Sequence, residues 1–150
     1  MPRPAAAVRR SRKGAAAAEL AILAPILFFL FAIAVDYGRI YYFTQTLRAA
    51  ARNGAYFAGN YTKIYTYTTP TQVAQADLTN LSPAPTVVFY YASSPTGPFT
   101  STTPTTTGYV QANITWTFHS ITNFPLVPQQ KTLVGTSVMR IAPVEPTFSN

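Results

Sequence analysis

The chain has 150 residues, a length that suits a single domain. Only 10% of its residues are charged and 48% are hydrophobic, whereas about 25% of the residues in a typical soluble domain are charged. This composition excludes a disordered polyelectrolyte and argues against an ordinary cytosolic enzyme. The chain has no cysteine, which rules out disulfide bonds and cysteine-bound zinc.

The net charge of +7 is concentrated at the N-terminus. Five of the eleven basic residues precede Gly14, namely Arg3, Arg9, Arg10, Arg12 and Lys13. A surface that binds nucleic acid carries its basic residues spread over a folded face, so we expect no nucleic-acid partner. A basic cluster directly before an apolar run indicates a membrane segment instead.

The apolar run extends over residues 15–35 and contains one charge, Glu19, and one proline, Pro25. At about 1.5 Å per residue it forms a helix of roughly 31 Å, close to the ~30 Å hydrocarbon core of a bilayer. The basic flank predicts a cytoplasmic N-terminus and an extracytoplasmic C-terminal part. A secretory signal cleaved after Ala34 is the alternative, but a carboxylate costs about 2.5–3.5 kcal/mol near the bilayer centre, and a disposable signal gains nothing from Glu19.

The junction of leader and apolar run reads Arg12-Lys13-Gly14-Ala15-Ala16-Ala17-Ala18-Glu19-Leu20. A glycine after a basic leader, with a glutamate at the fifth residue beyond it, resembles the processing site of type IV pilin-like proteins, particularly of the tight-adherence (Tad/Flp) class. The segments Leu23-Ala24-Pro25, Asp36-Tyr37-Gly38-Arg39 and 49–58 extend the resemblance to the TadE-like pseudopilin family, with a looser similarity over 108–142. Family members often have Glu-Phe where Asp36-Tyr37 stands, and Glu where Asn53 stands.

The resemblance implies that a prepilin peptidase cleaves after Gly14 and exposes the ammonium group of Ala15. Glycine also lacks the side chain that would hinder approach of the scissile backbone to a protease. The resemblance further implies that Glu19 pairs with the new N-terminus of a neighbouring subunit, an attraction of about 1 kcal/mol in water and several times more at a lower effective dielectric. In the alternative, Glu19 only snorkels to the headgroups. The expected partners are a prepilin peptidase, other pilin-like subunits with the Tad inner-membrane machinery, and membrane lipid.

Beyond the apolar run, Asp36 and Arg39 are spaced for an ion pair on a helix, and Tyr37, Tyr41 and Tyr42 form an aromatic belt. We interpret Asp36, Tyr37 and Arg39 as an anchor at the membrane interface. Apolar or small residues then recur at helical spacing up to Ala58, with Gln45, Arg48, Arg52 and Asn53 on the opposite, wetter side. One helix is therefore expected from about Ala15 to Ala58, ending near Gly59-Asn60.

The rest of the chain predicts a small α+β domain. A short helix is expected to begin at Pro70 and to stop by Pro83, followed by strands over 86–92, 110–118 and 131–141. The second strand alternates strictly between apolar and polar residues. The Ser/Thr/Pro-rich stretch 93–107 is predicted to be a mobile loop. The fold class is thus α+β: a single-pass N-terminal membrane helix that extends into a small domain with an antiparallel sheet packed on the helix.

The expected organisation is a basic cytoplasmic leader (1–14), a transmembrane helix (15–35), a helix extension (36–60) and an extracytoplasmic domain (61–150). No catalytic constellation, phosphate loop or metal cluster is visible, and the single histidine, His119, falls on the polar face of a strand. We therefore expect no enzyme, cofactor, metal or small-molecule substrate. The favoured function is a minor pilin-like protein of the bacterial inner membrane that assembles an adhesion pilus or secretion apparatus. The alternatives are a signal-anchored binding or envelope module that never enters a pilus, and a secreted β-rich protein.

Overall fold

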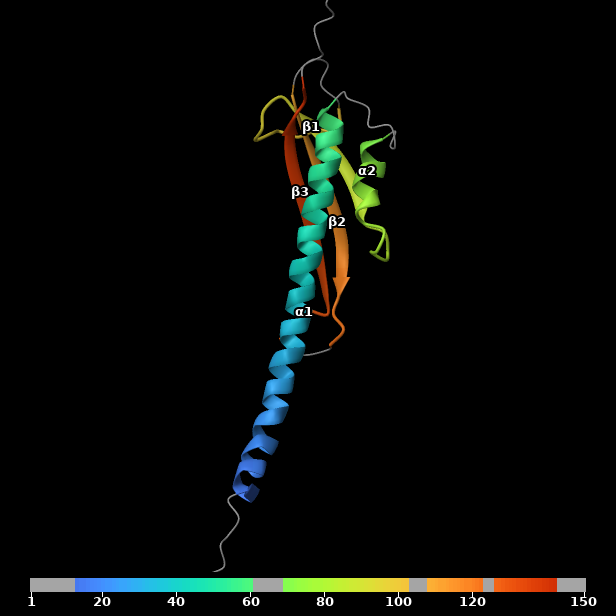
Figure 1. The fold of residues 1–150 in the computed structure, drawn as a ribbon. Helices are drawn as coiled ribbons and strands as arrows, with labels where there is room; N and C mark the ends of the chain where they lie inside the picture. The colour runs from blue at the N-terminus through green and yellow to red at the C-terminus, as the bar shows by residue number, and fades with distance from the viewer. Residues whose placement is uncertain (1–12, 61–68, 103–107, 123–125, 143–150) are drawn as a thin grey trace, which may run out of the picture.

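The computed structural model of the chain describes residues 13–60, 69–102, 108–122 and 126–142. In these ranges the chain forms a long helix α1 (Lys13–Gly59), a short helix α2 (Pro70–Ala76) and the strands β1 (Thr86–Ala92), β2 (Tyr109–His119) and β3 (Gln130–Arg140). The expected α+β class is confirmed. The sheet lies against the C-terminal half of α1, and the N-terminal half extends away from the domain (Figure 1).

Helix α1 is continuous through Pro25. Proline removes one helical hydrogen bond, a loss that helices in apolar surroundings tolerate where local adjustment satisfies the freed carbonyl. Burial along α1 begins at Ala32 and continues to Gly59, and from Ile40 onward it follows the predicted stripe. The buried residues lie on one face of the helix, most of them three or four residues from another member of the set: Ala32, Asp36, Ile40, Leu47, Ala50, Ala51, Gly54, Ala55 and Gly59. The polar residues Gln45, Arg48, Arg52 and Asn53 are exposed, as the sequence predicts.

The three strands form one antiparallel sheet in the order β1-β2-β3. Ile114 of the central strand β2 lies opposite Val87 of β1 and Gly135 of β3. The alternation predicted for β2 is confirmed, because Val110, Ala112, Ile114, Trp116 and Phe118 are all buried. Their face of the sheet packs on α1, and the short helix α2 lies beside α1 and β1. The domain therefore has two layers, a sheet and a pair of helices.

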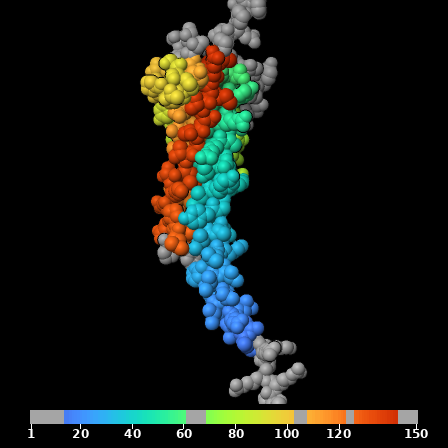
Figure 2. All heavy atoms as spheres, turned by 90° about the vertical axis from the view of Figure 1, so that its left-hand side faces the viewer, coloured from blue at the N-terminus to red at the C-terminus, as the bar shows by residue number. Residues whose placement is uncertain are grey.

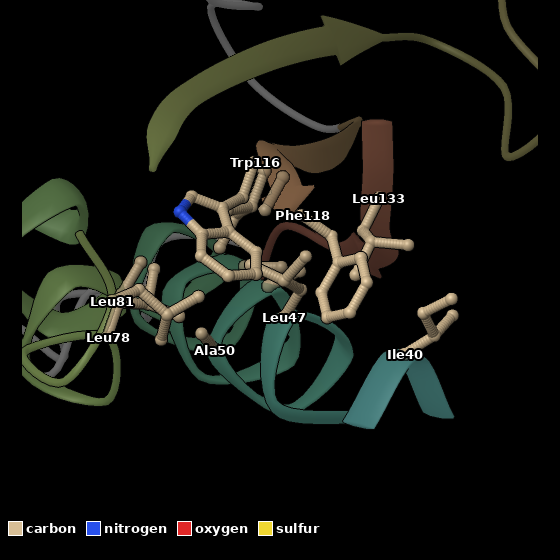
Figure 3. Close-up of a cluster of buried hydrophobic side chains, with 13 residues drawn as sticks. Ile40, Leu47, Ala50, Leu78, Leu81, Trp116, Phe118 and Leu133 are labelled. Carbon is tan, nitrogen blue, oxygen red and sulfur yellow. The ribbon is translucent and has the colours of Figure 1, made fainter. Parts of the chain in front are cut away.

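The core between these layers is built around aromatic rings from α1 and β2. Phe43 of α1 lies 5.0 Å from the ring of Trp116 and 6.1 Å from that of Phe118, measured between ring centroids. The Trp116 indole N–H donates a hydrogen bond of 2.9 Å to the carbonyl of Pro83, which satisfies its polar group inside the core. Figure 3 shows aliphatic side chains around the rings of Trp116 and Phe118: Leu47 of α1, Leu78 and Leu81 from the segment that follows α2, and Leu133 of β3.

Strand β3 approaches α1 so closely that only glycine fits at one position. A Cβ atom added to Gly135 would lie 2.4 Å from the carbonyl carbon and oxygen of Leu47, both backbone atoms that cannot rotate away. In the space-filling view of Figure 2, β3 and the C-terminal half of α1 lie side by side over their length. The contact fixes the distance between helix and sheet at the centre of the domain.

One predicted element, the short helix, differs in detail from the structure. The short helix starts at Pro70 as expected, capped by the Thr69 hydroxyl, which accepts a bond from the Gln72 N–H, but its helical residues end at Ala76. In the described part of the stretch predicted to be mobile, Thr100 pairs with Tyr91 through two backbone hydrogen bonds of 2.6 and 2.7 Å. Residues 103–107 lie outside the described residues, as does most of the leader, so their predicted character stays a prediction.

Candidate functional site

The N-terminal half of α1 carries the residues predicted to be processed and paired. Gly14, Ala15 and Glu19 all lie on this part of the helix and all are exposed. Every residue from Gly14 to Phe31 is exposed, including large apolar side chains: Leu20, Ile22, Leu23, Ile26, Leu27, Phe28, Phe29, Leu30 and Phe31. Among the helices that the structure describes, only α1 is long and apolar enough to cross a membrane, and its most apolar stretch packs against almost nothing in the domain.

Glu19 is the one carboxylate on this apolar surface. It stands four residues after Ala15, so the two positions lie one turn apart on the same face of the helix. A Cβ atom at Gly14 would meet no atom within 4 Å, so the fold itself does not require glycine there. Packing within the chain therefore explains neither the glycine at position 14 nor the glutamate at position 19.

Asp36 lies where the exposed half of α1 meets the domain, and it is the only buried charged side chain among the described residues. Its carboxylate accepts hydrogen bonds from the backbone N–H groups of Ile121 (3.2 Å) and Thr122 (3.1 Å). The Thr122 hydroxyl donates a further, short bond to it. Asp36 therefore holds the connection between β2 and β3 against the helix.

The surroundings of Asp36 favour its charged form. Burial raises the pKa of its carboxyl group, but hydrogen bonds from the Thr122 hydroxyl and from the backbone N–H groups of Ile121 and Thr122 lower it. The Arg39 guanidinium, 3.3 Å from the carboxylate, lowers it further. The net pKa of Asp36 lies below its ordinary value of 3.8, because the donors outweigh the burial.

Tyr37 and Arg39 contact the same end of the sheet. The Tyr37 hydroxyl donates to the carbonyl of Leu126 at 3.2 Å, so a second residue of the helix holds the connection between β2 and β3. The Arg39 guanidinium lies 5.1 Å from the centre of the Phe118 ring and 5.7 Å from that of Phe43, in addition to its ion pair with Asp36. The three residues interpreted as a membrane-interface anchor thus join the helix to the domain.

Sequence reasoning found the ion pair of Asp36 and Arg39 but not the hydrogen bonds from Ile121 and Thr122. These partners stand more than eighty residues further along the chain, and no spacing rule relates them to Asp36. One signal was available: a single Asp directly after a long apolar run needs donors, because a buried carboxylate without them is unstable.

The described residues offer little for binding a small ligand or metal. They contain no group of three or more His, Asp or Glu side chains that could hold a metal ion. A shallow hollow on the helix surface is lined by Ala49, Arg52, Asn53, Tyr56 and Met139, and it is open to solvent. His119 is exposed at the end of β2, as its place on the polar face predicts.

An apolar helix that projects from a small α+β domain, with one carboxylate in its exposed half, is typical of a membrane-anchored protein. Residues 14–55 match the model of the TadE-like protein family, which confirms the resemblance seen in the sequence. The match covers the exposed half of α1, Glu19, and the Asp36–Arg39 junction. No curated protein and no solved structure matches the chain.

This TadE-like segment indicates a protein associated with a Tad pilus. Proteins of this family are components of pilus assembly and are not known as enzymes. Membership in the family implies association with pilus subunits and Tad machinery. The apolar helix that carries the match is a candidate membrane anchor.

Proposed function

We propose that the protein is a minor pilin-like subunit of the bacterial inner membrane that is cut after Gly14 and assembles with other pilin-like subunits through the N-terminal half of α1. A prepilin peptidase removes the basic leader on the cytoplasmic side, and the domain stands on the opposite side of the membrane. The observation that carries the proposal is the exposed helix from Gly14 to Phe31 within the TadE-like segment.

The exposed helix needs an apolar environment on all sides. Leu20, Ile22 and Phe28 expose 62%, 70% and 66% of their surface, whereas the apolar residues between the helix and the sheet are buried. Lipid satisfies such a surface, and so do neighbouring helices of the same kind. Both environments are available to a subunit that waits in the membrane and then joins an assembly.

Glu19 supports assembly over a purely lipid-covered anchor. A carboxylate among apolar side chains is costly in lipid unless a positive group accompanies it. Cleavage after Gly14 creates such a group, the ammonium of Ala15, and a neighbour staggered along the helix axis presents it to Glu19. The pair is then stronger than in water because apolar side chains surround it.

Replacement of Glu19 by Gln tests this proposal. The variant keeps the side-chain volume and removes the charge, so the helix inserts at least as easily, whereas pairing with a neighbouring N-terminus is lost. A photo-crosslinking residue placed at the exposed Ile22 reports contacts with other pilin-like subunits in native membranes. If the pair contributes about 1.4 kcal/mol, association and with it the crosslinked yield falls about tenfold. Pilus number falls in parallel.

The matched control is Asp77→Asn, which removes a carboxylate from the exposed surface of the outer domain and should leave crosslinking unchanged. Wild-type crosslinking and pilus formation in Glu19→Gln would contradict the proposal. Glu19 would then snorkel to the headgroups or pair with Ala15 of its own helix, and the protein would act as a signal-anchored envelope module.

A further inference from the structure

Two large apolar side chains are exposed at the end of the domain nearest the exposed half of α1. Ile121 follows the end of β2 and Leu126 precedes β3, and they expose 72% and 74% of their surface. These are the two highest values among the large hydrophobic residues of the described domain, and they are comparable to those of the apolar helix itself.

The position of both residues along α1 is fixed by hydrogen bonds. The backbone N–H of Ile121 bonds to Asp36, and the backbone carbonyl of Leu126 accepts a bond from Tyr37. Asp36 is the first residue after the apolar run 15–35, which is about as long as the hydrocarbon core is thick. Ile121 and Leu126 therefore lie at the level where the helix leaves the bilayer.

A bilayer placed one turn deeper gives the same answer. If the hydrocarbon core begins at Leu20 rather than Ala15, twenty residues at 1.5 Å place its far boundary near Ile40, and both side chains then lie below the surface. Tilting the helix shifts the boundary further along the chain in the same direction. With the hydrocarbon core starting at Ala15 or at Leu20, these side chains thus lie at or below the level where α1 leaves it.

The charges around this end of the domain suit a membrane surface. Arg39 is part-exposed, and Lys131 and His119 are exposed on the neighbouring strand ends. The one carboxylate at this end, Asp36, is buried and ion-paired with Arg39, while Asp77 accepts a hydrogen bond from Asn53 near the opposite end of α1. The exposed Tyr37, Tyr41 and Tyr42 complete an interfacial set of aromatic and cationic residues.

We infer that the domain has a second membrane contact, in which Ile121 and Leu126 insert into the headgroup region beside the exit of α1. The domain is then held at two points, the helix and this apolar pair, and stands on the bilayer in a fixed orientation. Figure 1 shows the geometry: the ends of β2 and β3 that flank the pair lie beside α1 where its uncovered half begins. The inference rests on the membrane-anchor part of the proposed function.

The chain has no cysteine, so single-cysteine variants can carry an environment-sensitive fluorophore without further changes. The full-length protein is reconstituted in vesicles of phosphatidylcholine and phosphatidylglycerol, with nitroxide either on the headgroup or at the end of the acyl chain. Labels on Ile121→Cys and on Leu126→Cys should show blue-shifted emission and quenching by the headgroup nitroxide. A label on the exposed Thr96→Cys, in the turn at the far end of the domain, should show neither.

One further variant separates the possible failures. A label on Leu27→Cys, within the exposed half of α1, should be quenched by the acyl-chain nitroxide; if it is not, the membrane anchor itself is wrong. Quenching of Leu27→Cys without quenching at Ile121→Cys and Leu126→Cys overturns the second contact alone. Blue-shifted emission there without nitroxide quenching also overturns it, because a protein surface and not lipid then covers the pair.

A charge placed in the contact gives an independent check. Ile121→Asp combined with the label on Leu126→Cys should abolish the headgroup quenching, because the aspartate opposes insertion of the pair. Ile121 is exposed, so this substitution leaves the core intact. Unchanged quenching would contradict the inference.

Discussion

Asp36 joins the helix to the domain through more hydrogen bonds than any other side chain that the structure describes. Its four donors come from the β2–β3 connection and from Arg39 on its own helix. A buried carboxylate is stable only with such donors. The N–H groups of Ile121 and Thr122 in turn need Asp36 as their acceptor, because a buried N–H group without an acceptor costs free energy. The residue therefore acts as a structural lock at the exit of the apolar segment.

Replacement of Asp36 by Asn should destabilise the domain by about 1–3 kcal/mol. The amide removes the charge and turns one acceptor into a donor facing N–H groups. The matched control, Asp77→Asn, changes an exposed carboxylate that binds Asn53 and should shift stability by no more than about 1 kcal/mol. Thermal unfolding in detergent micelles, followed by fluorescence of Trp116, the only tryptophan, measures both variants. Equal melting temperatures for the two variants would contradict the lock.

The same carboxylate predicts a pH dependence. Because the pKa of Asp36 in the folded protein lies below its ordinary value of 3.8, its stabilisation is complete above that value and is lost as the pH falls through the lower, folded-state pKa. The melting temperature of the wild type should thus drop below about pH 4, and Asp36→Asn should show a smaller drop over the same range. Parallel pH profiles for the two proteins would assign the acid sensitivity to other groups.

At the scale of elements, the close packing of β3 on α1 depends on Gly135. A methyl group there meets the backbone of Leu47, so Gly135→Ala must push the strand away from the helix. Overpacking of this kind costs about 1–3 kcal/mol, or roughly 4–8 °C in melting temperature for each kcal/mol in a small domain. The control is Gly38→Ala, where a Cβ meets nothing within 4 Å and helix formation gains about 0.5–1 kcal/mol.

The outcome is read from the same Trp116 fluorescence melts. A Gly135→Ala protein that melts at or above the wild-type temperature would show that β3 is not held at this distance. The two glycines are a fair comparison because both substitutions add one methyl group, and only one of them adds it against a fixed backbone.

The sequence predicted elements well where a periodic pattern was long. The two-residue alternation from Val110 to His119 and the helical stripe from Ile40 to Ala58 each contain enough repeats to distinguish strand from helix. It did not predict the approach at Gly135, because no local pattern records how near another element comes. Nor did it predict the bonds from Ile121 and Thr122 to Asp36, which connect distant parts of the chain.

At the scale of the whole molecule, the protein divides into an uncovered apolar helix and a domain built on the continuation of the same helix (Figures 1 and 2). Helix α1 is continuous across the junction, so the exposed half and the domain share one helix. Asp36 and Tyr37 add a second connection at the junction. A pilin-like subunit built this way can change its surroundings from lipid to neighbouring helices without rearranging its domain.

The mature N-terminus distinguishes a processed pilin-like subunit from an uncut anchor and from a secreted protein. The full-length protein is expressed with a prepilin peptidase of a Tad system, extracted from membranes and analysed by intact mass and N-terminal sequencing, with Gly14→Val as the matched variant. Processing after Gly14 predicts a wild-type chain that begins at Ala15 and lacks residues 1–14, and a Gly14→Val chain that retains the leader. A wild-type chain that remains uncut, or one that begins at Val35, would contradict it.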